Sequence, residues 1–171
     1  MHYWLMKSEP DAFSIDDLAR VKTEPWSGVR NYQARNFMRD RMQLGDGVLL
    51  YHSSCAEPGV VGVGEVASTA YPDPTQFDRK SHYFDPRSSR EEPRWMLVDI
   101  AFKRKLARTV TLAELKQQPR LDGCMLLQRG SRLSILPLTK AQWTVILSLE
   151  HELQDDSSAA KIIIRATRRK K

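Results

Sequence analysis

The chain has few cysteines and no long apolar segment. Only two of its 171 residues are cysteines, Cys55 and Cys124, and their separation matches neither a zinc-ligand nor a redox spacing. We therefore expect free thiols without a disulfide framework, as is usual for an intracellular protein. Six residues precede the first lysine, too few for the apolar part of a secretory signal, and no later run approaches the roughly 18 apolar residues of a membrane span. The sequence predicts a soluble protein that does not bind membranes.

Several enzyme signatures are also missing. A zinc deaminase needs H-x-E together with P-C-x-x-C, an α/β-hydrolase needs G-x-S-x-G, and nucleotide-binding loops need a glycine pattern, none of which occurs. His52 and Cys55 lie three residues apart but have no further ligands nearby. No repeat of roughly 20 to 50 residues is present, which excludes solenoids and propellers. We therefore predict neither a metal site nor a cofactor, and these enzyme classes are poorly supported.

Positive charge is present but is concentrated at one end of the chain. There are 27 lysines and arginines against 21 aspartates and glutamates, which gives a formal charge of +6. Six of the basic residues lie in residues 161–171, which contain no acidic residue, so residues 1–160 have 21 charges of each sign. A nucleic-acid site in the folded part must therefore be a local cluster. One candidate cluster is Arg30, Arg35, Arg39 and Arg41, opposed only by Asp40.

Apolar runs and turn-forming residues alternate in a way that predicts an α+β fold. Strands are expected at residues 3–7, 48–52, 59–67, 95–105 and 132–136. Helices are expected after the N-cap residues Ser14, Asn31, Thr111 and Thr139. Residues 69–93, rich in Pro, Asp, Ser and Arg, predict a long surface loop. Short strands interrupted by small helices favour a mixed or antiparallel sheet curled into a partial barrel.

Residues 26–39, WSGVRNYQARNFMR, place a tryptophan in a glycine-marked turn directly before an arginine-bearing helix. Asn31 is suited to begin a helix that runs to about Met42. Its apolar residues form one stripe, while Arg35 and Arg39 share the other face. Those two arginines are either phosphate ligands or a solvated helix face.

Five strings in fixed order carry a family resemblance: YWLMKSEP, WSGVRNYQARNF, YHSSC followed by GVVGVGEV, YPDPTQFD and PRW. They closely resemble the EVE domain over about residues 2–149. The resemblance implies a PUA-like fold, a curved mixed β-barrel with flanking short helices, for residues 1–153, and we expect residues 154–171 to be a basic, flexible tail. It also implies a module that binds DNA or RNA by receiving one base in a pocket, and specifically a cytosine modified at C5. We expect a monomer in the cytoplasm, or in the nucleus of a eukaryote.

A flipped base is a flat ring with polar edges, so its pocket needs an aromatic plate, fixed hydrogen-bond groups and nearby cations. Trp26 offers a stacking face, and Gly28 leaves room for a ligand to approach the backbone. Arg30 has a planar fork suited to phosphate, and Asn31 either caps the helix or contacts a base edge. The neighbouring helix residues Tyr32 and Arg35 belong to the same predicted site.

The resemblance adds residues from two strand ends and one later aromatic residue. The strand ends contribute Lys7, Ser8, Glu9, His52 and Ser53. There, the Glu9 carboxylate would accept a hydrogen bond from the exocyclic amino group of cytosine. The Ser8 or Ser53 hydroxyl would donate a hydrogen bond to its carbonyl oxygen or receive a hydroxymethyl group. The alternative is that residues 8–10 form a turn and have no role in binding. Trp95 is either a second aromatic contact for the base or a plug of the barrel. Tyr51 and Tyr83 are weaker candidates for contact with the base. Trp4 and Trp143 are assigned to the core.

Two other functions compete with that of a reader of a modified base. Lys7, Ser8 and Glu9 are similar to the lysine, hydroxyl and glutamate with which some ASCH relatives hydrolyse acylated cytidine, so the alternative is a nucleoside amidohydrolase. The second alternative is a sequence-independent nucleic-acid binder that uses the basic tail, because polycationic segments bind phosphate without base preference.

Overall fold

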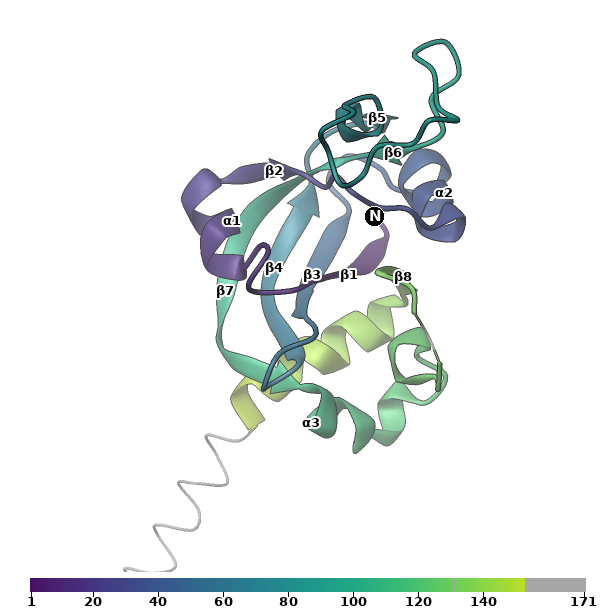
Figure 1. Cartoon of the computed structure of the whole chain (residues 1–171). Coiled ribbons are helices and arrows are strands. Elements are labelled where there is room, and N and C mark those ends of the chain that lie inside the picture. Colours follow the sequence, from purple (N-terminus) through teal and green to yellow (C-terminus); the bar gives the residue numbers. More distant parts are fainter. Residues whose placement is uncertain (131, 153–171) are drawn as a thin grey trace, which may run out of the picture.

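A curled six-stranded sheet forms the body of the protein in the computed structural model, which describes residues 1–130 and 132–152 (Figure 1). The strands lie in the order β2 (Thr23–Pro25), β7 (Asp99–Thr111), β4 (Gly59–Val66), β3 (Gly47–His52), β1 (Tyr3–Ser8) and β8 (Ile135–Leu138). Neighbouring strands of this sheet are antiparallel except β1 and β3, which run parallel. This mixed half-barrel with short helices confirms the predicted PUA-like α+β fold.

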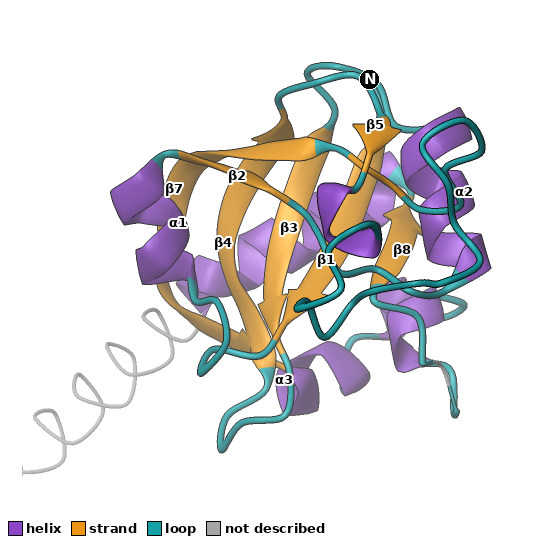
Figure 2. Cartoon of the chain, turned by 45° about the horizontal axis from the view of Figure 1, so that its top comes forward, coloured by secondary structure: helices purple, strands orange, loops and turns teal. Residues whose placement is uncertain are grey.

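Both faces of the sheet are buried, which explains why its central strands are almost continuously apolar. In β3, Val48 and Leu50 point to one apolar cluster, and Leu49 and Tyr51 point to the other. The first cluster is covered by α1 (Ile15–Val21) and α2 (Tyr32–Asp40), and the second by α3 (Leu112–Lys116) and the helix 140–152. Figure 2 shows α1 beside β7 and helix 140–152 behind the sheet.

The helices begin at the predicted N-cap residues. The side chains of Ser14 and Thr111 each form a reciprocal capping box, with Asp17 and Glu114 respectively, and Asn31 Oδ1 accepts a hydrogen bond from Ala34 N at 3.0 Å. Thr139 Oγ1 likewise accepts one from Gln142 N at 3.1 Å. Helix α2 ends at Asp40, two residues before the expected end. The sequence therefore located all four helix starts correctly.

The strands deviate more from expectation than the helices do. The predicted strand 95–105 is interrupted at Val98 and continues to Thr111, and the predicted strand 132–136 lies at Ile135–Leu138. Strand β2 and the three-residue 3-10 helices η1 (Pro74–Gln76), η2 (Pro119–Leu121) and η3 (Met125–Leu127) were not predicted. The predicted tail, residues 154–171, lies outside the described residues. No helix in the described part of the chain is long and apolar enough to cross a membrane.

Residues 71–97, which we call the insert, project from the body beside α2 (Figure 1). Instead of a simple surface loop, the insert contains a two-stranded sheet of β5 (Tyr71–Pro72) and β6 (Met96–Leu97). Its centre is the fully buried Gln76, whose Nε2 donates to the carbonyl oxygens of Asp73 and Trp95 at 2.7 and 2.8 Å. Its Oε1 accepts from Ser88 Oγ and from two backbone N–H groups. These non-local bonds hold the insert in one conformation.

Candidate nucleic-acid interface

A cavity of about 640 Å³ opens where the carboxyl ends of β1 and β3 meet the segments after β2 and before β8. Because β1 and β3 are parallel, both strands end at the same edge of the sheet. There, Ser53 N donates to Ser8 O at 2.9 Å, and Lys7 N donates to Ser134 O at 2.8 Å. Its lining residues are Lys7, Ser8, Glu9, Ala12, Phe13, Glu24, Pro25, Trp26, Ser27, Gly28, Val29, Arg30, Ser53, Tyr83, Arg132, Leu133 and Ser134.

Trp26 forms an aromatic part of the cavity wall. Its backbone N–H is held by Val98 O at 2.9 Å, and the Phe13 ring meets its indole edge-on with a centroid separation of 6.2 Å. The side chain is only 8% exposed, so it packs in the core and borders the cavity at the same time. Trp26 is therefore rigidly placed before any ligand arrives.

Among the three buried tryptophans, Trp26 differs from Trp4 and Trp95 in its indole N–H group. Trp4 Nε1 donates to Asp46 Oδ2 at 3.1 Å, and Trp95 Nε1 donates to Asp85 Oδ2 at 2.8 Å. Trp26 Nε1 donates to none of the residues in ranges 1–130 and 132–152, and it is not among their buried unsatisfied atoms. A Trp N–H near the interior normally has a partner. The Trp26 N–H therefore remains open to solvent or a ligand.

Lys7 brings a cation to the cavity that no described carboxylate neutralises. Its ammonium lies 5.9 Å from the centroid of the Tyr51 ring, and within the described ranges it forms no ion pair. Burial lowers the pKa of Lys7, because removing the ammonium from water disfavours its charged form. A lysine in this setting gains from an incoming hydrogen-bond acceptor or anion.

Residues Lys7, Ser8 and Glu9 all line the cavity, but their side chains do not form a connected catalytic group. Consecutive residues of a strand point to opposite faces, so the Lys7 ammonium and the Ser8 hydroxyl diverge. Glu9 Oε1 instead accepts from Ser54 Oγ at 3.0 Å. Among the residues described, no hydrogen bond joins any two of these three side chains. The arrangement does not favour the alternative hydrolase, which needs a base within reach of its nucleophile.

Arg30 borders the cavity, yet its guanidinium is committed to the insert rather than free for phosphate. Nη1 donates to Asp73 Oδ2 at 2.9 Å, and Nη2 donates to Thr75 Oγ1 at 2.9 Å and to Tyr83 O at 2.6 Å. Burial alone would raise the pKa of Asp73, but the hydrogen bonds from Arg30 and Thr75 hold it below its usual value. In this conformation Arg30 ties the segment after β2 to the insert, and its contact with phosphate stays a prediction.

Gly28 makes room for a protein side chain rather than for a ligand. Its φ of +81° lies in the left-handed region, and a Cβ added there would lie 2.7 Å from the Tyr83 ring. Its N–H also donates to Asp73 Oδ2 at 2.9 Å. The Tyr83 ring, 42% exposed, consequently lies over Gly28 at the rim of the cavity. The sequence made Tyr83 a weaker candidate than Gly28, but in the structure both residues line the cavity and the Tyr83 ring covers Gly28.

Comparison with known proteins decides the family of this chain. Residues 2–149 match the model of the EVE domain. The chain belongs to the EVE domain family. Human thymocyte nuclear protein 1 is 45% identical over 168 residues, which cover 88% of this chain and 74% of that protein. The EVE assignment made from the five sequence strings is thereby confirmed.

Solved structures of similar proteins have the same fold. A Pseudomonas syringae protein is 52% identical with a TM-score of 0.84, covering 86% of this chain and 99% of that one. The human THYN1 protein, solved in complex with DNA containing 5-methylcytosine, is 43% identical with a TM-score of 0.81, covering 88% and 98%. This EVE domain therefore shares its architecture with a protein that was solved in complex with DNA containing 5-methylcytosine.

Five predicted site residues of the EVE domain lie outside the cavity lining: Asn31, Tyr32, Arg35, His52 and Trp95. Asn31 caps α2, and His52 Nε2 accepts a hydrogen bond from Ile15 N at 3.0 Å, at the start of α1. Trp95 is buried and stacks on Tyr32, with a centroid separation of 4.9 Å and an interplanar angle of 20°. Their contacts with other parts of the protein explain why they do not face the cavity.

Several cavity residues were not predicted from the sequence at all. Arg132, Leu133 and Ser134 come from the segment before β8, which no motif marks, and Glu24 belongs to the unpredicted strand β2. Phe13 is adjacent to a helix cap and reads locally as a packing residue. These residues reach the cavity only through long-range strand pairing, which a local pattern does not reveal.

Proposed function

We propose that this EVE domain is a nucleic-acid binding module that takes a cytosine with a C5 substituent out of the strand and into the cavity. The observation that carries the proposal is the cavity wall itself, where a fixed Trp26 indole with an uncommitted N–H lies near the polar ends of β1 and β3. The DNA complex of the similar human THYN1 protein supports the same ligand class. The protein acts as a monomer, independently of membranes, in the cytoplasm or in a eukaryotic nucleus.

The shape and chemistry of the cavity suit a pyrimidine. Binding sites for small ligands commonly occupy about 300 to 1,000 Å³, and 640 Å³ leaves space for a ring, a C5 substituent and part of the sugar. The Trp26 indole provides a flat apolar contact for the ring. A pre-formed aromatic wall reduces the ordering cost of binding.

Polar groups at the strand ends fit the edge of cytosine. A Glu9 carboxylate accepts hydrogen bonds and suits the exocyclic amino group, while the Ser8 and Ser53 hydroxyls suit the carbonyl oxygen or a polar C5 substituent. The Lys7 ammonium donates to a base oxygen or to the phosphate next to the base. These contacts favour cytosine over a pyrimidine without an exocyclic donor.

Base extrusion from a duplex costs a few kcal/mol, and contacts in the cavity must offset this cost. We therefore expect single-stranded or mismatched sites to bind more tightly than fully paired sites with the same modification. DNA and RNA oligonucleotides of one sequence, each with a single unmodified or C5-substituted cytosine, provide the test panel. Fluorescence anisotropy gives the ratio of dissociation constants between unmodified and modified probes.

Substitution of Trp26 should abolish this discrimination. Because base–aromatic stacking contributes about 1 to 3 kcal/mol, Trp26→Ala should weaken binding of the modified probe about 10- to 100-fold and bring the ratio close to one. Trp26→Phe, which keeps a smaller aromatic ring, should retain part of the affinity for the modified probe and part of the discrimination between the probes. Trp143→Ala is the matched control, because Trp143 packs on Tyr3 with centroids 4.8 Å apart, outside the cavity lining. Equal binding of all probes by the unaltered protein would contradict the proposal.

A further inference from the structure

A cationic aromatic surface lies outside the cavity, where α2 meets the insert. It consists of Tyr32, Arg35 and Arg94, and we call it the Tyr32 platform. Tyr32 is 46% exposed although its ring stacks on the buried Trp95. The Arg35 and Arg94 guanidinium carbons lie 5.0 and 5.8 Å from the centroid of the Tyr32 ring, and Arg94 Nη2 donates to the Tyr32 hydroxyl. Two cations therefore flank one exposed ring.

The platform has an excess of positive charge. Arg39, on the same helix, is neutralised by Asp40, which accepts from its Nε at 2.6 Å and from its Nη2 at 2.8 Å. Arg35 has no carboxylate within salt-bridge distance in the described ranges; its Nη1 donates to Arg94 O instead. Burial and the nearby positive charge of Arg39 both lower the pKa of Arg35, as expected where an anion is missing.

The only described carboxylate that pairs with Arg94 is shared. Asp85 lies 3.8 Å from Arg94 Nε and 3.5 Å from Arg87 Nε, and it also accepts the Trp95 indole N–H. Arg35, Arg39, Arg87 and Arg94 thus oppose Asp40 and Asp85, four guanidinium groups against two carboxylates. Guanidinium groups suit phosphate because their planar fork can donate two parallel hydrogen bonds to two of its oxygens.

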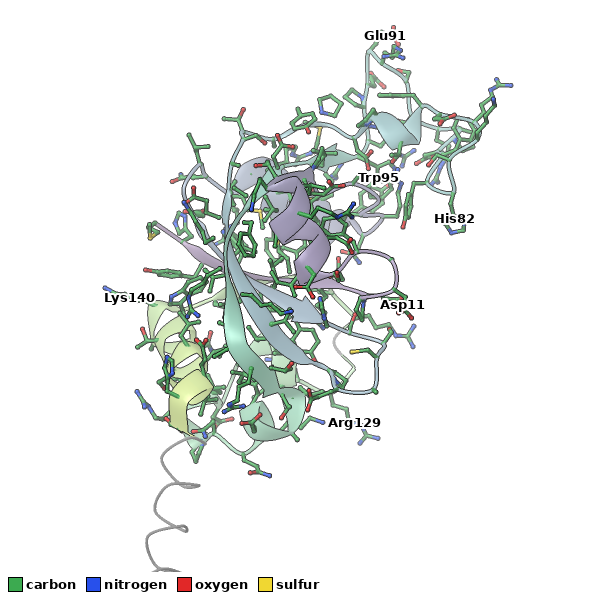
Figure 3. The ribbon with its side chains drawn as sticks, turned by 90° about the vertical axis from the view of Figure 1, so that its left-hand side faces the viewer. Asp11, His82, Glu91, Trp95, Arg129 and Lys140 are labelled. Atoms are coloured by element: carbon green, nitrogen blue, oxygen red, sulfur yellow. The ribbon has the colours of Figure 1, made fainter. Side chains whose placement is uncertain are left out.

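Contacts between aromatic rings and Arg30 connect the platform to the cavity. The Arg30 guanidinium carbon lies 5.3 Å from the centroid of Tyr83, which borders the cavity, and 5.4 Å from the centroid of Trp95, on which Tyr32 stacks. Figure 3 shows Trp95 at the base of the projecting insert, with His82 and Glu91 farther out. The platform and the cavity rim are therefore joined through one side chain, Arg30, which contacts the rings of both Trp95 and Tyr83.

We infer that the Tyr32 platform binds the sugar–phosphate backbone beside the extruded base, with Arg35 and Arg94 on phosphate oxygens and the Tyr32 ring against a sugar or neighbouring base. This inference rests on the proposed function, since it assigns a second contact surface to the same ligand. It separates two tasks: the cavity selects the base, and the platform supplies affinity that depends on charge but not on the modification.

The salt dependence of binding tests this assignment. Each neutralised phosphate contributes about 0.7 to 0.9 to the slope of log Kd against log salt. Arg35→Gln should therefore reduce that slope by about one and weaken binding about tenfold at low salt, while leaving the ratio between modified and unmodified probes unchanged. Arg120→Gln removes the same charge from an exposed position in η2 and should change neither quantity. Equal slopes for the two variants would overturn the inference.

A second measurement keeps the test valid even if Arg35→Gln perturbs folding, which thermal unfolding reports. Probes with a neutral methylphosphonate at one position beside the modified cytosine remove the anion instead of the cation. The unaltered protein should bind at least one such probe about tenfold more weakly than the fully charged probe. Arg35→Lys keeps the charge but not the planar fork of the guanidinium, so it should bind the charged probe more weakly than the unaltered protein does, with the same slope of log Kd against log salt. No loss at any position on either side of the cytosine would exclude a backbone contact.

The two proposals fail in different ways. If the unaltered protein does not distinguish modified from unmodified cytosine, the reader function fails, whereas the slope difference between Arg35→Gln and Arg120→Gln still reports on the platform. If the discrimination is present but the slopes coincide, the cavity proposal stands and the platform is only a structural contact between α2 and the insert.

Discussion

The cavity wall and the base of the insert contain similar residue types but differ in how their polar atoms are used. At the base of the insert, the buried Asp73 accepts hydrogen bonds from Arg30, Thr75 and the backbone N–H of Gly28. In the cavity wall, Lys7 has no ion-pair partner and the Trp26 indole N–H no acceptor among the residues that the structure describes.

This difference separates structural polar groups from groups available to a ligand. A buried polar group without a partner costs about 1 to 3 kcal/mol, so proteins normally satisfy such groups unless water or a ligand does so. Asp73 and Gln76 meet this requirement within the protein. The Lys7 ammonium and the Trp26 N–H are open to solvent and are therefore available to a ligand, which is why we assign binding to the cavity and support to the insert.

The largest expected effect comes from breaking the base of the insert. Asp73→Ala removes the partner of Arg30, whose side chain is mostly buried, and leaves the Gly28 and Thr75 N–H groups unbonded. We expect a loss of about 3 kcal/mol in the free energy of unfolding, measured by urea denaturation. Asp40→Ala is the control, because the Arg39–Asp40 pair is exposed to solvent and should contribute little. Similar losses in both variants would show that the insert is not anchored through Asp73.

A smaller effect is expected from filling the space under Tyr83. Gly28 and Gly45 have nearly equal φ values, +81° and +83°, so alanine is strained at both positions by about 1 to 2 kcal/mol. Gly28→Ala additionally drives its Cβ into the Tyr83 ring, whereas no heavy atom lies within 4 Å of a Cβ at Gly45. Gly28→Ala should therefore destabilise the protein by about 1 kcal/mol more and also weaken binding of the modified probe. Equal effects of the two substitutions on binding would show that the position of Tyr83 does not matter for binding the modified base.

The smallest expected effect concerns His52 and the pH. Burial lowers the pKa of His52 below its ordinary value of 6.5, and Nε2 must be unprotonated to accept from Ile15 N. The unfolded chain then binds a proton more readily than the folded one, so this contribution to stability is complete above about pH 6.5, declines below that value and is lost as the pH falls through the lower pKa of the folded state. Because His52 is only half-buried, the loss stays below about 1 kcal/mol.

His52→Gln isolates this contribution, since the Gln side-chain oxygen can accept the same backbone hydrogen bond at any pH. The unfolding free energies at pH 7 and pH 5, measured by urea denaturation, should differ less in the variant than in the unaltered protein. The variant should also retain the preference for a modified base, because His52 caps α1 and does not line the cavity. Loss of that preference would show that His52 contributes to the binding of the modified base.

Local signals account for what the sequence predicted well. The helix starts at Ser14 and Thr111 depend on contacts three residues apart, and both capping boxes are present. The apolar character of β1 and β3 follows from burial on both faces of the sheet. The fold class could therefore be derived from short windows, and the five ordered strings identified the family.

The site was predicted less completely because its decisive contacts are distant in sequence. Arg30 was expected to bind phosphate, but its carboxylate partner Asp73 lies 43 residues away. Trp95 was considered a base contact or a barrel plug, yet it donates to Asp85 and stacks on Tyr32 in a separate junction. A polar or aromatic residue near a turn serves a ligand or the protein equally well until its partner is known.

Strand β1 pairs in parallel with β3 and in antiparallel with β8, the last strand of the sheet, and this has a consequence for biosynthesis. Lys7 leaves the ribosome well before Ser134, whose carbonyl oxygen accepts the Lys7 backbone N–H. The recognition site is thus assembled from segments that are far apart in the domain sequence, and a chain that ends before Arg132 lacks part of the cavity wall. Translation must therefore pass Ser134 before the wall of the cavity is complete.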